Sequence, residues 1–139
     1  MPDRKGVIMA KGHIHHIELY VSDLEQSIKF WSWFLTDLGY DLYQEWDKGQ
    51  SYKLEESYIV FVQTEERFME IPYHRCGVGL NHLAFHADSR AEVDVMTEKL
   101  IQRGIKILYE DRHPFAGGDD YYAVFFEDPD RIKVEFVAP

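Results

Sequence analysis

Two histidines at matching places in the chain are the first residues whose type and position suggest chemistry. His16 lies in the run 12–22, and His82 lies in the run 79–89, which has a similar order of polar and apolar residues. Alternation of this kind is typical of a β-strand, whose successive side chains point to opposite faces. In both runs the histidine falls on the face opposite the apolar residues. We therefore predict that the two strands turn their histidines toward one shared metal site.

A third possible ligand lies in the last predicted strand. Apolar residues alternate along residues 131–137, and Glu135 falls on the face opposite to them. Two neutral imidazoles and one carboxylate suit a divalent first-row metal ion and leave positions open for water or substrate, as in catalytic sites. We predict that one divalent ion of Fe, Mn, Ni or Zn, able to polarise a bound oxygen, is held by His16, His82 and Glu135. The alternative is that each of these is an ordinary packed or surface residue.

Further polar residues share faces or loops with these three and could touch a substrate. The candidates for a general acid or base are Tyr20, His86 and Tyr121. The candidates for substrate contact are Glu18, Tyr52 and His113. The loop 111–120 contains paired glycines and could close over the site or be a passive surface loop. For the tyrosines, the alternative is a filling role at the mouth of the site.

The elements that must position these residues repeat in the order strand, helix and three strands. In the first half, Ser22 and Glu25 form the pattern of a helix capping box, and Gly39 is suited to end that helix. In the second half, Ser89 and Glu92 repeat the capping box. The apolar stripe predicted for the first helix is Leu24, Ile28, Trp31, Leu35 and Leu38. The strands predicted besides those of the two histidines cover residues 40–46, 51–55, 58–63, 105–110, 121–127 and 131–137.

This repeated order predicts an α+β protein made of two βαβββ modules. Their curved, mostly antiparallel sheets would form a cup, with the helices outside and the histidine faces inside. The predicted boundaries are an N-terminal leader at 1–12, a first module at 13–64, a linker at 65–78 and a second module at 79–139.

The overall composition limits the possible partners. The chain has 139 residues with 15 Lys and Arg against 25 Asp and Glu, so no positive surface for nucleic acid is expected. No apolar run is long enough for a membrane span, and residues 1–12 lack the apolar segment of a secretory signal. The single cysteine, Cys76, cannot form an internal disulfide, which favours a reducing compartment and a cytoplasmic location.

Four motifs carry a resemblance to a known family. They are His-His-Ile-Glu-Leu-Tyr-Val-Ser-Asp-Leu at 15–24, Phe-Trp leading to Leu-Gly within 30–39, Asn-His-Leu-Ala-Phe at 81–85, and Phe-Glu-Asp-Pro-Asp running into Lys-Val-Glu within 126–135. With them the chain resembles, over about residues 13–138, the vicinal oxygen chelate superfamily. That superfamily includes glyoxalase I, methylmalonyl-CoA epimerase, fosfomycin-resistance enzymes, extradiol dioxygenases and bleomycin-resistance proteins.

The resemblance implies a site and a class of substrate. The family's metal ligands match His16, His82 and Glu135 in this sequence, and the family's substrates are small molecules that bind the metal through oxygen. Members are often homodimers in which modules of two chains complete each cup. The resemblance therefore implies a small-molecule substrate and a homodimer.

Departures from the family patterns narrow the chemistry that the resemblance implies. The metal site of glyoxalase I has four ligands, including a second glutamate on the last strand of the first half. In this sequence the matching residues 58–63 contain no carboxylate. Extradiol dioxygenases carry a tyrosine where Phe125 stands and a histidine shortly upstream, whereas His113 is further back. Bleomycin-resistance proteins keep the fold without the metal ligands. We therefore expect glyoxalase-like lyase, isomerase or transferase chemistry ahead of dioxygenase chemistry.

Two other functions remain open at this point. One is a drug- or metabolite-binding resistance protein that holds its ligand in an aromatic cup without turnover. The other is a structural partner domain that has inherited its histidines. A ligand bound equally well by metal-free protein would favour the binding function over the metal-dependent enzyme.

Overall fold

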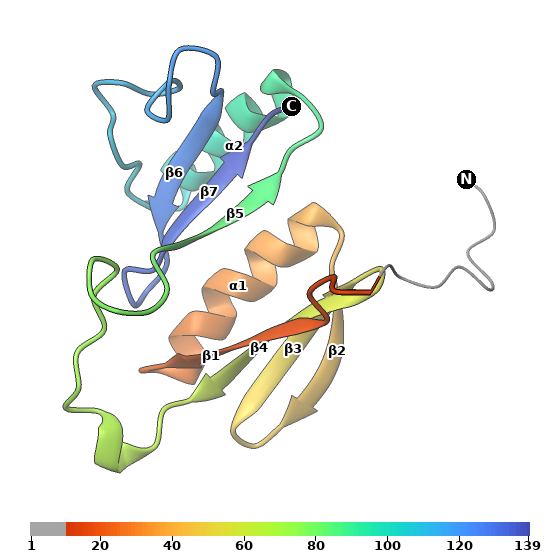
Figure 1. Ribbon diagram of the computed structural model, residues 1–139, viewed down its shortest axis with the longest axis vertical. Helices are drawn as coiled ribbons and strands as arrows, with labels where there is room; N and C mark the ends of the chain where they lie inside the picture. Colours follow the sequence, from red (N-terminus) through yellow and green to blue (C-terminus); the bar gives the residue numbers. More distant parts are fainter. Residues whose placement is uncertain (1–10) are drawn as a thin grey trace. The chain divides into compact units, whose positions relative to one another are not determined.

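The computed structural model describes residues 11–139, so most of the leader predicted at 1–12 lies outside the described residues. The chain divides into two compact units between Met69 and Glu70. Each unit contains one α-helix of more than ten residues and one sheet (Figure 1). In the described part of the chain, no helix is both long and apolar enough to span a membrane.

The first unit has a four-stranded sheet in the order β1-β4-β3-β2. β1 pairs with β4 in parallel, and the other two pairings are antiparallel. A short 3-10 helix, η1, follows the sheet at Glu66–Phe68. The remaining elements are β1 (His16–Val21), α1 (Leu24–Leu38), β2 (Asp41–Trp46), β3 (Gly49–Leu54) and β4 (Ser57–Gln63).

The second unit repeats this arrangement with one strand fewer. Its three-stranded sheet has the order β5-β7-β6, in which β5 and β7 are parallel and β6 and β7 are antiparallel. The elements are β5 (His82–His86), α2 (Arg90–Gln102), β6 (Ala123–Glu127) and β7 (Lys133–Val137). The predicted α+β fold with repeated modules is confirmed, and the sheets contain four and three strands.

The strand predicted at 105–110 is reduced to one isolated bridge between Ile107 and Phe126. Ile107 and Leu108 are adjacent and both buried, which a regular strand with alternating faces does not favour. Tyr109 then has a φ of 57°, a left-handed conformation that turns the chain away from the sheet. The side chains of Leu108 and Tyr109 pack against Phe125 instead. The prediction of a strand here was therefore wrong beyond the single bridge.

One face of each sheet packs against the helix of its own unit. Along β1, Ile17 and Leu19 are half-buried while the residues between them are exposed, as the predicted alternation requires. Trp31 of α1 is fully buried and stacks on Phe61 of β4 with ring centroids 5.0 Å apart. The opposite faces are the ones that carry His16 and His82. Within each unit, the histidine therefore lies on the sheet face opposite that unit's helix.

The buried stripe of α1 differs from the predicted one. Phe30 and Phe34 are buried beside Trp31 and Leu35, while the predicted stripe residues Leu24, Ile28 and Leu38 are only half-buried. Phe30 and Phe34 meet the ring of Trp31 edge-on, and Trp31 stacks on Phe61 of β4. In α2 the buried apolar residues are Val93, Met96 and Leu100.

The helix ends follow capping chemistry, with one correction. Asp23, rather than the predicted Ser22, is the N-cap of α1, and its carboxylate accepts a hydrogen bond from the Gln26 N–H. Gly39 ends α1 in a left-handed conformation with a φ of 103°, as predicted. Ser89 caps α2 as predicted, since its hydroxyl accepts from the Glu92 N–H at 3.1 Å.

Substitution of this cap gives a first test of the second unit's stability. Ser89→Ala removes the acceptor for the Glu92 N–H and is expected to lower the free energy of unfolding by about 1 kcal/mol. Ser89→Asp keeps an acceptor and serves as the matched control. Urea unfolding followed by circular dichroism measures both. Equal losses in the two variants would contradict the capping role.

Candidate metal centre

The two histidines occupy equivalent positions in the two sheets. His16 is the first residue of β1 and lies opposite Tyr58 in the parallel pairing with β4. His82 is the first residue of β5 and lies opposite Lys133 in the parallel pairing with β7. Both histidines are exposed and lie on the face away from the helix. The repeat seen in the sequence is therefore a repeat of sheet register.

Within the second unit, the structure brings His82 and Glu135 together. Glu135 lies opposite Ala84 on β5, so its neighbour across the strands has only a methyl side chain. The Glu135 residue is 2% exposed, and its Oε2 lies 3.4 Å from Nε2 of His82. A buried carboxylate requires a compensating partner, because removing a charge from water is costly. The imidazole of His82 is one such partner for the Glu135 carboxylate.

Tyr121 is a second partner of Glu135. Its hydroxyl donates a hydrogen bond to the Glu135 carboxylate, and this bond, with burial and the carboxylate charge, raises the pKa of Tyr121 to about 12. The phenol therefore stays protonated at neutral pH and acts there as a donor, not as a base. Of the three acid–base candidates, this is the one that the structure places against Glu135.

The Tyr121 hydrogen bond predicts a pH-dependent contribution to stability in metal-free protein. The pKa of Tyr121 is raised to about 12 in the folded chain, so the stabilisation is complete below pH 10, the ordinary value for tyrosine, and is lost as the pH rises toward 12. The urea midpoint of Tyr121→Phe should thus approach that of the native protein over this range. Glu135→Gln should lower the phenol's pKa toward 10 in an ultraviolet titration. A pKa unchanged in that variant would contradict the assignment.

His16 has a different environment in the first unit. Its ring stacks on Tyr58 with centroids 4.7 Å apart and an interplanar angle of 3°. The position that matches Glu135 in this unit is Val60, which lies opposite Glu18. The first unit therefore offers a histidine but no carboxylate at the corresponding place on its last strand.

The residue before each histidine contacts its ring. Oδ1 of Asn81 lies 2.7 Å from Nδ1 of His82, and Nδ1 of His15 lies 2.9 Å from Nδ1 of His16. Sequence reasoning did not identify either contact. The one feature of the sequence that could have indicated these contacts is that the two residues of each pair are neighbours in the chain.

The other predicted site residues fall into two groups. Glu18 and Tyr20 share the exposed face of β1 with His16, and His86 shares that of β5 with His82. Tyr52, in contrast, is 4% exposed and lies opposite Ile59 on the helix side of its sheet. We therefore do not include Tyr52 in the proposed site.

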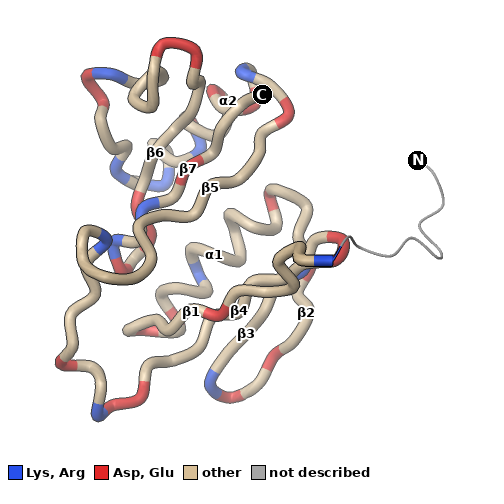
Figure 2. Tube along the Cα trace, viewed as in Figure 1, with Lys and Arg blue, Asp and Glu red and all other residues tan. Residues whose placement is uncertain are grey.

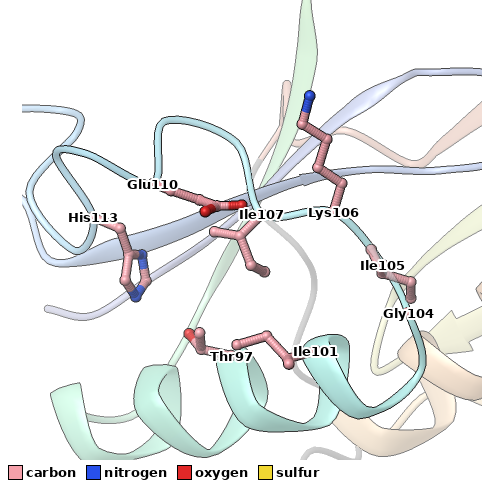
Figure 3. A pocket seen from close by; sticks show the side chains of 8 residues that line it. All are labelled: Thr97, Ile101, Gly104, Ile105, Lys106, Ile107, Glu110 and His113. Atoms are coloured by element: carbon pink, nitrogen blue, oxygen red, sulfur yellow. The ribbon is translucent and has the colours of Figure 1, made fainter.

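His113 lies beside α2 in a separate hollow of about 370 Å³ (Figure 3). Thr97 and Ile101 line this hollow from the helix, and Glu110 lines it from the segment after the isolated bridge. His113 was predicted to contact the substrate, and the structure places it in this hollow. The residues that line this hollow do not include His82 or Glu135.

The donor chemistry of His82 and Glu135 fits a metal ion. If the neutral imidazole carries its proton on Nδ1, the atom 2.7 Å from Oδ1 of Asn81, and the carboxylate is ionised, two acceptor atoms face each other at 3.4 Å, which favours a cation or a proton between them. One ion with bonds of about 2.0–2.2 Å could reach both atoms. Within residues 11–139, no three His, Cys, Asp or Glu side chains are grouped closely enough to hold a metal. The described centre is therefore a pair of candidate ligands.

The acidic residues of the chain are not confined to this centre. Figure 2 shows acidic positions distributed over both units, among scattered lysines and arginines. Among the described residues, the acidic positions are therefore spread over both units (Figure 2).

Comparison with known proteins identifies the family. A family model described as the Glyoxalase/Bleomycin resistance protein/Dioxygenase superfamily matches residues 13–136. The chain belongs to this superfamily, which confirms the resemblance to vicinal oxygen chelate proteins.

The relatives at high identity cover nearly the whole chain. The protein YqjT of Bacillus subtilis (strain 168), whose name states no activity, is 66% identical over 126 residues, covering 91% of this chain and 98% of YqjT. A crystal structure of a candidate glyoxalase from Bacillus halodurans has a TM-score of 0.92 at 61% identity, covering 93% of this chain and 97% of its own.

A more distant solved structure shares the fold alone. The fosfomycin resistance protein FosX of Listeria monocytogenes has a TM-score of 0.68 at 22% identity, and the match covers 92% of this chain and 93% of FosX.

Proposed function

We propose that the chain is a metal-dependent enzyme that acts on a small, oxygen-bearing substrate. The observation that carries this proposal is the buried Glu135 carboxylate 3.4 Å from Nε2 of His82, on neighbouring strands. Membership of a superfamily that includes metal-dependent enzymes supports it.

We propose His16 as the third ligand. It occupies in β1 the register position that His82 occupies in β5, and it lies on the sheet face away from its helix. Two imidazoles and one carboxylate suit divalent Fe, Mn, Ni or Zn. When bound, such an ion would polarise a substrate oxygen and stabilise negative charge that develops on it.

The residues around the proposed ligands would orient the substrate and control protons. Tyr121 donates its hydroxyl hydrogen to Glu135 and so would hold the carboxylate in place, which leaves the phenol oxygen as an acceptor for a substrate donor. His86 is exposed on the same strand face as His82 and is the candidate for moving a proton to or from the substrate. Val60 has the register position in the first unit that Glu135 has in the second, so no fourth ligand is proposed there. A set of three protein ligands leaves more coordination positions for substrate than a set of four. Lyase, isomerase or transferase chemistry fits this arrangement.

Metal analysis tests the proposed set. Protein purified without chelator should contain close to one divalent ion per chain by plasma mass spectrometry, and His16→Ala should lose most of it. His13→Ala removes a nearby histidine that lies outside β1, so it serves as the matched control. Absence of metal from the native protein, or equal retention in both variants, would remove the proposal.

We also propose a homodimer in the cytoplasm, as family resemblance and the lone Cys76 suggest. Co-expression of His16→Ala and Glu135→Gln chains would show where each site obtains its ligands. If each site takes His16 from one chain and Glu135 from the other, a mixed dimer keeps one intact site and binds about half the native amount of metal. If all three ligands come from one chain, the mixed dimer binds none. A monomer by light scattering would contradict the dimer.

A further inference from the structure

Each candidate ligand histidine has its Nδ1 atom occupied by the side chain of the residue that precedes it. For His82 the partner is the amide oxygen of Asn81 at 2.7 Å, and for His16 the partner is Nδ1 of His15 at 2.9 Å. The two contacts lie in different units, so the same local device occurs twice. A ring nitrogen that donates one hydrogen bond fixes which nitrogen keeps its lone pair.

The orientation of the Asn81 amide is set by its other hydrogen bond. Nδ2 of Asn81 donates to the backbone oxygen of Arg75 at 3.2 Å, so Oδ1 is the atom that faces His82. An amide oxygen only accepts, and Nδ1 of His82 must therefore carry the proton. The lone pair of the neutral ring is then on Nε2, the atom 3.4 Å from Glu135.

The segment that supplies this carbonyl is itself held to the sheet. The Arg75 guanidinium donates to Oε1 of Glu127 at 2.9 Å and to the backbone oxygen of Arg131 at 3.2 Å. The Arg75 and Glu127 side chains are only 19% and 18% exposed, so this ion pair is partly shielded from water. A chain of contacts thus runs from β6 through Arg75 and Asn81 to the ring of His82.

The ring of His16 is held by two neighbours. Tyr58 stacks on it, and the same Tyr58 ring meets His15 edge-on with centroids 5.5 Å apart. Between two neutral imidazoles one Nδ1 must donate and the other accept. Which ring donates depends on the two tautomers; if His16 donates, its Nε2 keeps the lone pair, as in His82.

We propose that Asn81 and His15 are positioning residues that hold His82 and His16 in the Nδ1–H tautomer, with Nε2 of each directed to the metal. The part of this inference that concerns the metal rests on the proposed function. The part that concerns the tautomers does not. Partners of this kind raise the basicity of a ligand histidine and fix its ring, and their loss commonly costs about 10–100-fold in metal affinity.

Tautomers can be read directly in the full-length, metal-free protein. Nitrogen-15 spectra of histidine-labelled protein at a pH of about 8.5, above the ordinary range for histidine, should show a proton on Nδ1 of residues 82 and 16. A proton shared between His82 and Glu135 would add a signal at Nε2 and leave the one at Nδ1. Asn81→Leu should shift His82 toward the Nε2–H form common in free imidazoles and leave His16 unchanged. Asn81→Asp keeps an acceptor and should restore the native spectrum. His15→Leu should change His16 alone, so each variant is the control for the other.

Cobalt(II) titration followed by visible absorption gives the second readout. Asn81→Leu should bind cobalt about 10–100-fold more weakly, and Asn81→Asp should recover most of the affinity. Unchanged tautomers in both leucine variants, or a native Nε2–H form, would overturn this inference. If the tautomers behave as expected but the native protein binds no cobalt, the proposed metal function fails while the positioning role stands.

Discussion

Replacement of Glu135 by glutamine is expected to lower zinc affinity by more than about 100-fold, since loss of groups that merely support a ligand already costs about 10–100-fold. Glutamine has nearly the same shape but removes the negative charge, and a neutral amide is a poor ligand for a first-row ion. The fold should survive, because the buried position keeps a side chain of the same size. Isothermal titration with zinc measures the affinity, and circular dichroism checks the fold.

A matched substitution separates this effect from a change in net charge. Glu98→Gln alters the charge by the same amount on an exposed position of α2, and its zinc affinity should stay within about twofold of native, as for most exposed sites away from special contacts. His82→Ala should resemble Glu135→Gln. Native affinity in Glu135→Gln would show that the carboxylate is not a ligand.

Replacement of Trp31 by alanine is expected to lower the free energy of unfolding by about 3–5 kcal/mol. The Trp31 side chain is fully buried, stacks on Phe61 and meets Phe30 and Phe34 edge-on. Its removal leaves a cavity between α1 and β4, the strand that carries Tyr58 beneath His16. The urea midpoint should fall sharply in equilibrium unfolding.

Trp46 provides the comparison for this prediction. It is 43% exposed at the end of β2, so Trp46→Ala should cost well under half as much as Trp31→Ala. Similar losses in the two variants would contradict the assignment of the core beneath the first sheet.

Alternation made the histidine strands predictable from the sequence. His16 and His82 were each predicted opposite an apolar face, and the burial along β1 and β5 confirms those faces. Period-2 patterns and capping residues are local, so short stretches of sequence suffice to identify them. The ligand roles of these residues stay predictions.

Contacts made by loops and by crowded apolar residues were not predictable in this way. Arg75 and Glu127 are 52 positions apart, and residues 65–78 were predicted only as a linker, so their support of Asn81 had no local signature. The strand predicted at 105–110 failed because Leu108 and Tyr109 pack on Phe125 rather than extending the sheet. Packing between distant residues outweighed local propensity there.

A crystal of the protein soaked in zinc, measured at the zinc absorption edge, tests the metal centre most directly. We expect one anomalous peak about 2.0–2.2 Å from Nε2 of His82, Nε2 of His16 and a carboxylate oxygen of Glu135. A peak bound by other residues, or no peak while His82 and Glu135 keep their 3.4 Å contact, would contradict the proposed metal site.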